Sequence, residues 1–178
     1  MRTDYIDPES MSHVLAALTP PNALVMKVCI AYGLRISDVL RLKTDDVFKR
    51  RFTIHELKTG KPRRIKLSDE LYTALLRQGG RLWIFEGRND WRRHRTRQAV
   101  WRDVKRAARA FRICANVAPH SARKLYAVQT YRRVGNLARV QRMLNHSDIE
   151  VTMIYAMADE LTKRKLRNRK KISASRQK

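Results

Sequence analysis

The sequence predicts a mainly α-helical α+β domain with one small antiparallel β-sheet. Apolar residues recur at helical spacing through most of the chain, and capping residues stand at the ends of these runs. Residues 47–68 differ, because β-branched and aromatic residues flank the turn-forming sequence KTGKP, a pattern typical of a hairpin. A chain of 178 residues suits one domain with one sizeable core.

Capping residues define the first two helices. Asp7 can accept a hydrogen bond from the first turn of a helix that starts at Pro8. Residues 20–33 are apolar nearly all round and end at Gly33, which predicts a buried core helix closed by a left-handed residue. The other elements expected before residue 96 are a short helix over 35–42, a capped helix over 68–80 and a short strand over 82–87.

The second half of the chain is predicted to be helical. The expected helices are a long basic one over 96–111 and three more over 121–134, 137–144 and 148–156. Lys and Arg dominate from Met157 onward, which divides the chain into a domain over residues 1–156 and a basic tail over residues 157–178. In a helical tail, Met157, Leu161 and Leu166 would form a thin apolar stripe, and a disordered basic arm is the alternative.

The net charge is +24, from 40 Lys and Arg residues against 16 Asp and Glu residues. Such a charge repels itself in the compact state, so we expect a polyanionic partner, with nucleic acid favoured over a membrane surface. No apolar run approaches the ~20 residues of a spanning helix and no N-terminal signal pattern is present, which predicts a cytoplasmic protein. Cys29 and Cys114 are the only cysteines and the histidines include no His-Glu-x-x-His pair, so neither a disulfide scaffold nor a zinc site is expected.

Two segments of the first half carry cations suited to phosphate. Arg35 stands at the start of a helix, where the macrodipole disfavours a cation, and Asp38 lies three residues on, where it could hold the guanidinium. Lys58 and Lys61 occupy the expected hairpin tip, without the upstream glycine and the Ser/Thr of a phosphate-binding P-loop. Each feature alone also fits a solvated surface, as an exposed arginine or an ordinary turn.

Two segments of the second half complete the set. His120 and Arg123 are three residues apart near a helix N-terminus, where backbone N–H groups favour an anion. In MLNHSDIEVTMIYA, Asn145 can end one helix in the left-handed conformation, and about two and a half turns separate His146 from Tyr155. Taken alone, His120 could merely cap its helix, and Tyr155 could belong to the core of a tight helix–turn–helix.

In chain order, the segments GLRISDVLRL, KTGK, HSAR and LNHSDIEVTMIYA resemble the motifs of the tyrosine recombinase catalytic domain, the phage integrase family. The resemblance runs from about Asp7 to Ala156. It implies the catalytic fold that tyrosine recombinases share with type IB topoisomerases. The catalytic residues it implies are the phosphate clamp Arg35 and Arg123, the proton-transfer groups Lys58 and His120, the phosphate ligand His146 and the nucleophile Tyr155, to which the helix-face argument adds Asp38 in support.

The function implied by this resemblance is site-specific recombination of double-stranded DNA, of the integrase or excisionase type. Tyr155 would cleave a strand to a 3′-phosphotyrosyl intermediate and a free 5′-hydroxyl, and a homo-oligomer, tetrameric on DNA, would exchange the strands. Two guanidiniums can neutralise a phosphodiester without a metal, and the covalent link stores the bond energy. We therefore expect neither a metal nor another cofactor.

The sequence also departs from the family pattern. Asn145 stands where the family commonly has glycine, a change that a left-handed backbone tolerates. Members usually carry an N-terminal DNA-clamping domain, and almost nothing precedes Asp7, so we expect an excised catalytic domain or a naturally short recombinase. Two other functions stay open: a type IB topoisomerase, which reseals the same strand, and a non-catalytic basic protein that binds nucleic acid through its charge.

Overall fold

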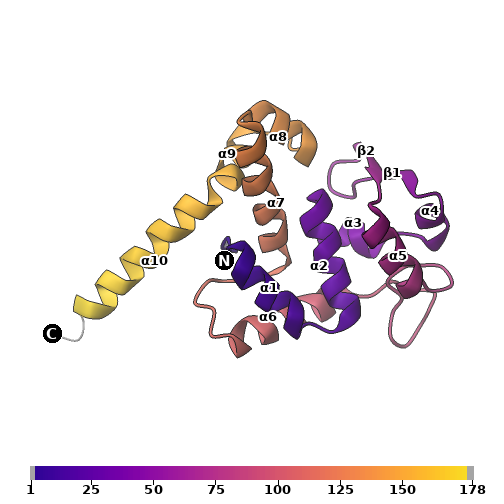
Figure 1. Ribbon diagram of the computed structural model, residues 1–178, viewed down its shortest axis with the longest axis horizontal. Coiled ribbons are helices and arrows are strands. Elements are labelled where there is room, and N and C mark those ends of the chain that lie inside the picture. Colours follow the sequence, from indigo (N-terminus) through magenta and orange to yellow (C-terminus); the bar gives the residue numbers. More distant parts are fainter. Residues whose placement is uncertain (1–2, 176–178) are drawn as a thin grey trace.

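The computed structural model describes residues 3–175, apart from the side chains of residues 166 and 169–175. Within this range the chain is mainly helical with one two-stranded sheet, as predicted (Figure 1). The elements follow in the order α1 (Pro8–Ala17), α2 (Pro20–Tyr32), α3 (Ile36–Leu40), α4 (Thr44–Phe48), β1 (Arg51–His55), β2 (Pro62–Lys66), α5 (Asp69–Gln78), α6 (Arg97–Ala110), α7 (Pro119–Val134), α8 (Leu137–Leu144), α9 (Ile149–Ala156) and α10 (Ala158–Ser175).

Helix α2 is the centre of the core. Its side chains Val25, Met26 and Val28 are at most 1% exposed, and the helix packs against α1, α3, α5 and α7. A second, smaller apolar cluster lies between α7 and α8, where buried Val140 and Leu144 pack near Tyr155 of α9. Since α7 contacts both α2 and α9, it connects the main core to the helix that carries Tyr155.

The capping residues predicted from sequence are confirmed. The side chain of Asp7 accepts from the Ser10 backbone N–H at 2.9 Å, and Asn145 ends α8 in the left-handed conformation with φ 51°. Gly33 ends α2 with φ 61°, and a Cβ atom there would lie 2.3 Å from the Tyr126 ring. Only glycine therefore fits at position 33 without displacing the ring of the tyrosine in α7.

The hairpin is confirmed, but the strand expected over residues 82–87 is wrong. Strands β1 and β2 pair antiparallel from Arg51 opposite Lys66 to His55 opposite Pro62, which leaves the KTGK segment in the turn. Residues 82–87 make only isolated bridges, one through Trp83 and one through Glu86. Ile84 and Phe85 are fully buried in the core, and among residues 3–175 no further strand pairs with this segment to complete a ladder.

The helices differ from the prediction chiefly in an additional helix, α4, and in the start of α7. Helix α4 was not predicted, since its five residues are too few for a helical period to show. Helix α7 begins at Pro119, not Ser121, because proline suits the first helical position and Ser121 caps the backbone N–H of Ala118. His120 and Arg123 thus both lie in the first turn of α7.

The described part of the tail is helical. Helix α10 projects away from the body of the domain (Figure 1). Its first half is held by polar contacts, from Thr162 to the Tyr5 backbone N–H at 3.1 Å and from Lys165 to Asp4 at 2.7 Å. Of the expected apolar stripe, Met157 and Leu161 are 43% and 49% exposed, and the side chain of Leu166 lies outside those described. Nowhere among the described helices is there one both long and apolar enough to cross a membrane.

Candidate active site

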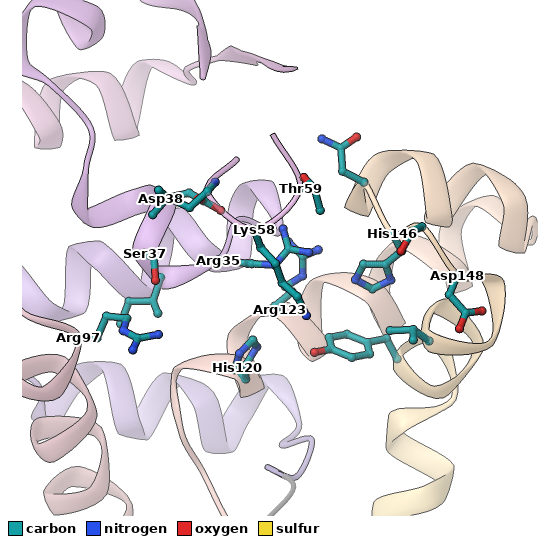
Figure 2. Close-up of a pocket in the computed structure, with 16 residues that line it drawn as sticks. Arg35, Ser37, Asp38, Lys58, Thr59, Arg97, His120, Arg123, His146 and Asp148 are labelled. Carbon is teal, nitrogen blue, oxygen red and sulfur yellow. The ribbon is translucent and has the colours of Figure 1, made fainter. Parts of the chain in front are cut away.

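One pocket brings together all six catalytic residues implied by the sequence. It has a volume of about 450 Å³ and opens where the hairpin turn, the start of α7 and the α8–α9 turn meet. In Figure 2, Arg35, Lys58 and Arg123 converge on its centre, with His146 on the opposite wall. The lining includes Arg35, Lys58, His120, Arg123, His146, Tyr155 and also Asp38.

Arg35 is held by a carboxylate, but not by that of Asp38. Arg35 is the N-cap of α3, with an extended backbone (φ −74°, ψ 145°), so the three-residue spacing to Asp38 does not place the two on one helix face. Asp38 instead accepts from the Leu57 backbone N–H at 3.0 Å, and its burial raises its pKa more than this bond lowers it. The prediction that Asp38 orients Arg35 is therefore wrong, and Asp38 fixes the hairpin to α3.

The partner of Arg35 is Glu56, which sequence reasoning missed. The Glu56 carboxylate pairs with Arg35 and, at 3.1 Å, with Arg63, and its side chain is fully buried. Burial alone would raise the pKa of Glu56, but the charges of Arg35 and Arg63 outweigh it and lower the pKa. One signal was available in the sequence, namely a single acid in a hairpin rich in cations. The full burial of the Glu56 side chain could not be predicted from that signal.

Arg123 is the most deeply buried cation of the site, at 1% exposure. Its Nη1 donates to the carbonyl of Gly33 at 2.5 Å and its Nη2 to the carbonyl of Leu144 at 2.6 Å. These carbonyls close α2 and α8, where the helix dipoles favour a cation. Burial and the nearby charge of Arg35 lower the pKa of Arg123 to about 10, so it stays protonated at neutral pH.

The pKa values of both histidines of the pocket are lowered. Desolvation, followed by the charges of Arg123 and Arg35, lowers the pKa of His146 to about 4. The His146 ring is fixed by a 3.0 Å hydrogen bond between Nδ1 and Thr152 Oγ1. His120 lies at the exposed rim, yet the loss of water around its ring in the pocket and the charge of Arg123 also lower its pKa.

Tyr155 lies half-buried one residue before the end of α9. Its ring meets that of His146 edge-on, with 5.2 Å between centroids, and Lys124 Nζ stands 5.8 Å from the ring centre. The ring is thus packed on one side and faces the pocket on another.

The hairpin lysines differ in position. Lys58 lines the pocket, whereas Lys61 is absent from the lining residues. A cation that sequence reasoning missed, Arg97 at the first position of α6, joins the pocket beside Ser37 (Figure 2). No three His, Cys, Asp or Glu side chains gather into a metal-binding group in the described part of the chain.

The sequence model of the phage integrase family matches residues 4–161. The chain belongs to this family. The integrase of Escherichia phage P2 is 29% identical over 154 residues, which cover 86% of the chain and 43% of that integrase. A tyrosine recombinase of Thermosipho africanus is 28% identical over 162 residues, which cover 85% of the chain and 56% of that protein. The chain thus spans about half the length of these curated relatives.

The fold of the family is also the fold of this chain. The catalytic domain of bacteriophage HP1 integrase superposes with a TM-score of 0.66 at 23% identity. The match covers 88% of the chain and 89% of that structure. The mainly helical domain with a two-stranded sheet is therefore the catalytic fold of the tyrosine recombinases, as the sequence predicted.

Proposed function

We propose that the chain is the catalytic part of a site-specific DNA recombinase, which cleaves and rejoins DNA through a 3′-phosphotyrosyl link to Tyr155. One observation carries this proposal: side chains from the four motif segments, spread between residues 35 and 155, line one cationic pocket. Residues 1–156 form the catalytic domain and residues 157–178 its basic tail. The protein acts on DNA in the cytoplasm and is encoded by a bacterium, an archaeon, or a phage or other mobile element.

The pocket suits phosphoryl transfer because negative charge accumulates on the non-bridging oxygens as the fifth bond to phosphorus forms. Arg35 and Arg123 neutralise that charge, and their positions are fixed before DNA arrives by Glu56 and by two backbone carbonyls. A free tyrosine has a pKa of about 10, so its phenolate needs such a cationic setting to act as a nucleophile at neutral pH.

Proton transfer falls to the remaining residues. The 5′-oxygen that leaves the phosphorus needs a proton, and Lys58, on the turn above the pocket, donates it. His120, at the rim, has a lowered pKa that favours the neutral ring, which accepts the phenol proton of Tyr155 during attack and releases it to solvent. A bound phosphate brings an opposite charge toward His146 and favours the protonated ring, which can then donate to a phosphate oxygen.

The test is to trap a covalent protein–DNA adduct. Duplexes with a nick and a random sequence are incubated with the protein, and those that become attached to it are recovered and sequenced. A recombinase enriches one sequence family, and two such duplexes exchange strands, whereas a topoisomerase reseals each strand to itself. A non-catalytic basic protein retains DNA in low salt but none after denaturation.

DNA binding by this chain is expected to depend strongly on salt. With a net charge of +24, log K should fall with log salt at about −0.9 per phosphate neutralised, irrespective of sequence. Fluorescence anisotropy with duplexes of unrelated sequence, between about 50 and 200 mM salt, measures the slope. An affinity that hardly changes over this range would show that the charge does not contact DNA.

Truncation after Ala158 is expected to uncouple cleavage by paired protomers while single-strand cleavage is retained. The exposed apolar residues Met157 and Leu161 offer a docking face for a neighbouring subunit, and the truncation removes Leu161 together with the helix that carries it. Paired and single cleavage are counted on a two-site DNA at equal occupancy. The control neutralises Lys163 and Arg164 to Gln in the full-length chain, which lowers charge but keeps the helix. If the truncated protein regains coordinated cleavage when more protein is added, the tail is only an electrostatic arm.

A further inference from the structure

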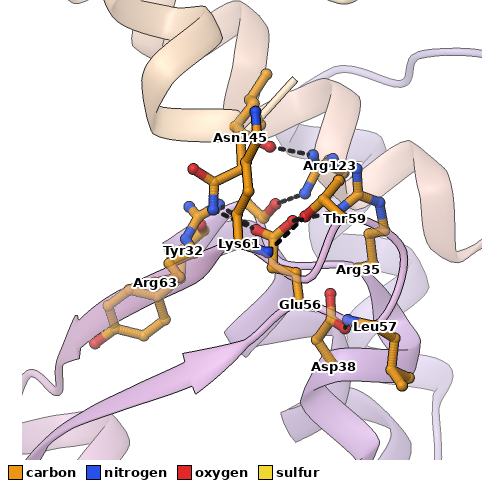
Figure 3. A network of polar contacts seen from close by, with 12 residues as sticks. Tyr32, Arg35, Asp38, Glu56, Leu57, Thr59, Lys61, Arg63, Arg123 and Asn145 are labelled. Atoms are coloured by element: carbon orange, nitrogen blue, oxygen red, sulfur yellow. Dashed lines mark hydrogen bonds and ion pairs between the residues drawn. The ribbon is translucent and has the colours of Figure 1, made fainter. Parts of the chain in front are cut away.

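The buried carboxylate of Glu56 contacts the start of α3, the hairpin and the α8–α9 turn, three segments that border the pocket (Figure 3). It pairs with Arg35 at the start of α3 and with Arg63 of β2. Its Oε1 also accepts a 3.3 Å hydrogen bond from the side-chain amide of Asn145, the residue directly before His146. Its Oε2 accepts from Thr59 at 3.3 Å, next to Lys58 on the hairpin turn.

The same carboxylate lowers the cost of placing several cations together. Arg35, Arg63 and Arg123 would repel one another in a pocket from which water is largely excluded. Glu56 supplies the only carboxylate, among the described residues, that is ion-paired with any of these three arginines. A neutral side chain of equal size would remove the ion-paired carboxylate that offsets this repulsion.

Asn145 has a role that its backbone alone does not require. With φ 51° the position favours glycine, which adopts this conformation without strain. The side chain of Asn145 instead reaches Glu56, and so links the α8–α9 turn to the hairpin. The amide therefore connects the residue before His146 to the carboxylate that holds Arg35.

We infer that Glu56 is a positioning residue of the active site, which orients Arg35 and, through the Asn145 amide, sets the His146 turn against the hairpin. It does not touch the DNA, since its side chain is fully buried. Glu56 determines the rate of cleavage by fixing where the cations stand, because errors of about 1 Å in such a site can cost on the order of 10²-fold in rate. This inference rests on the proposed cleavage by Tyr155.

The first test is the isosteric variant Glu56→Gln. We expect the single-turnover rate constant for adduct formation to fall about 10- to 100-fold. The dissociation constant for DNA should stay the same or decrease, because the variant has lost a negative charge. A merely structural role would lower the melting temperature and the fraction of protein that reacts, with an unchanged rate constant. Glu70→Gln is the matched control, since Glu70 is exposed on α5 and its loss changes the net charge equally.

Variants of Asn145 give an ordered prediction. Asn145→Gly keeps the backbone conformation but removes the amide, so the rate should fall about 3- to 10-fold. Asn145→Asp keeps the size of the side chain but sets a second carboxylate against Glu56. The rate of adduct formation should therefore fall further than in Asn145→Gly. If the glycine variant reacts as fast as the parent, position 145 serves only the backbone and the bridge has no function.

A measurement without DNA separates this inference from the proposed function. In ¹⁵N NMR, the Arg35 Nε–H and the Asn145 side-chain amide should give ordered, slowly exchanging signals in the parent and averaged signals in Glu56→Gln. Equal order in both proteins would overturn the positioning role, even if the parent cleaves DNA. Absence of any adduct from the parent, with the NMR difference present, would overturn the cleavage proposal and leave the positioning of Arg35 established.

Discussion

Tyr155→Phe is expected to abolish the covalent DNA adduct while DNA binding stays within about twofold of the parent. The change removes the hydroxyl that attacks phosphorus but keeps the ring, which packs beside His146 and the small cluster between α7 and α8. The folded state should therefore be unaffected. Adduct is measured on denaturing gels with a labelled nicked duplex, and binding by anisotropy at the same salt concentration.

Tyr131→Phe is the matched control for this variant. Tyr131 packs in the same cluster but is absent from the pocket lining, so its hydroxyl should be dispensable for cleavage. An adduct with Tyr155→Phe on DNA that the parent cleaves would mean that another side chain is the nucleophile. Loss of adduct in both variants would point to damage of the cluster and not to lost chemistry.

Arg123→Ala is expected to lose cleavage by on the order of 10²-fold or more and to unfold more easily than the parent. The guanidinium serves cleavage because it lines the pocket, and it serves stability because it donates to the carbonyls of Gly33 and Leu144. Leaving two buried carbonyls without donors should cost about 2–5 kcal/mol in the free energy of unfolding. Urea unfolding measures this loss, and the adduct assay, run where the variant is folded, measures cleavage.

Two comparisons interpret the Arg123 result. Arg133 lies on the same helix as Arg123 but is exposed. Arg133→Ala should therefore change neither cleavage nor the free energy of unfolding beyond the effect of one surface charge. Arg35→Ala should lose cleavage by a similar factor, on the order of 10²-fold. Its loss of stability should be smaller, because within the described structure Arg35 donates to no buried backbone carbonyl and Arg63 still pairs with Glu56. Normal cleavage by Arg123→Ala would show that the phosphate clamp lies elsewhere.

Most helices of this fold could be predicted because their ends depend on local chemistry. Asp7, Gly33 and Asn145 act through their own side chain or backbone conformation within one turn of the helix. The strand expected over residues 82–87 failed because a strand needs a partner. Within the part of the chain that the structure describes, no strand pairs with that segment, and its apolar pattern reflects the burial of Ile84 and Phe85 in the core.

The sequence by itself determined which residue types the site contains and their order along the chain, from Arg35 to Tyr155. Only the tertiary structure decided their partners. The carboxylate that holds Arg35 is Glu56, 21 positions away on the hairpin, and not Asp38, three positions away. The physical reason is that a capping residue interacts within its own turn, whereas pairing between buried charges depends on which segments the core brings together.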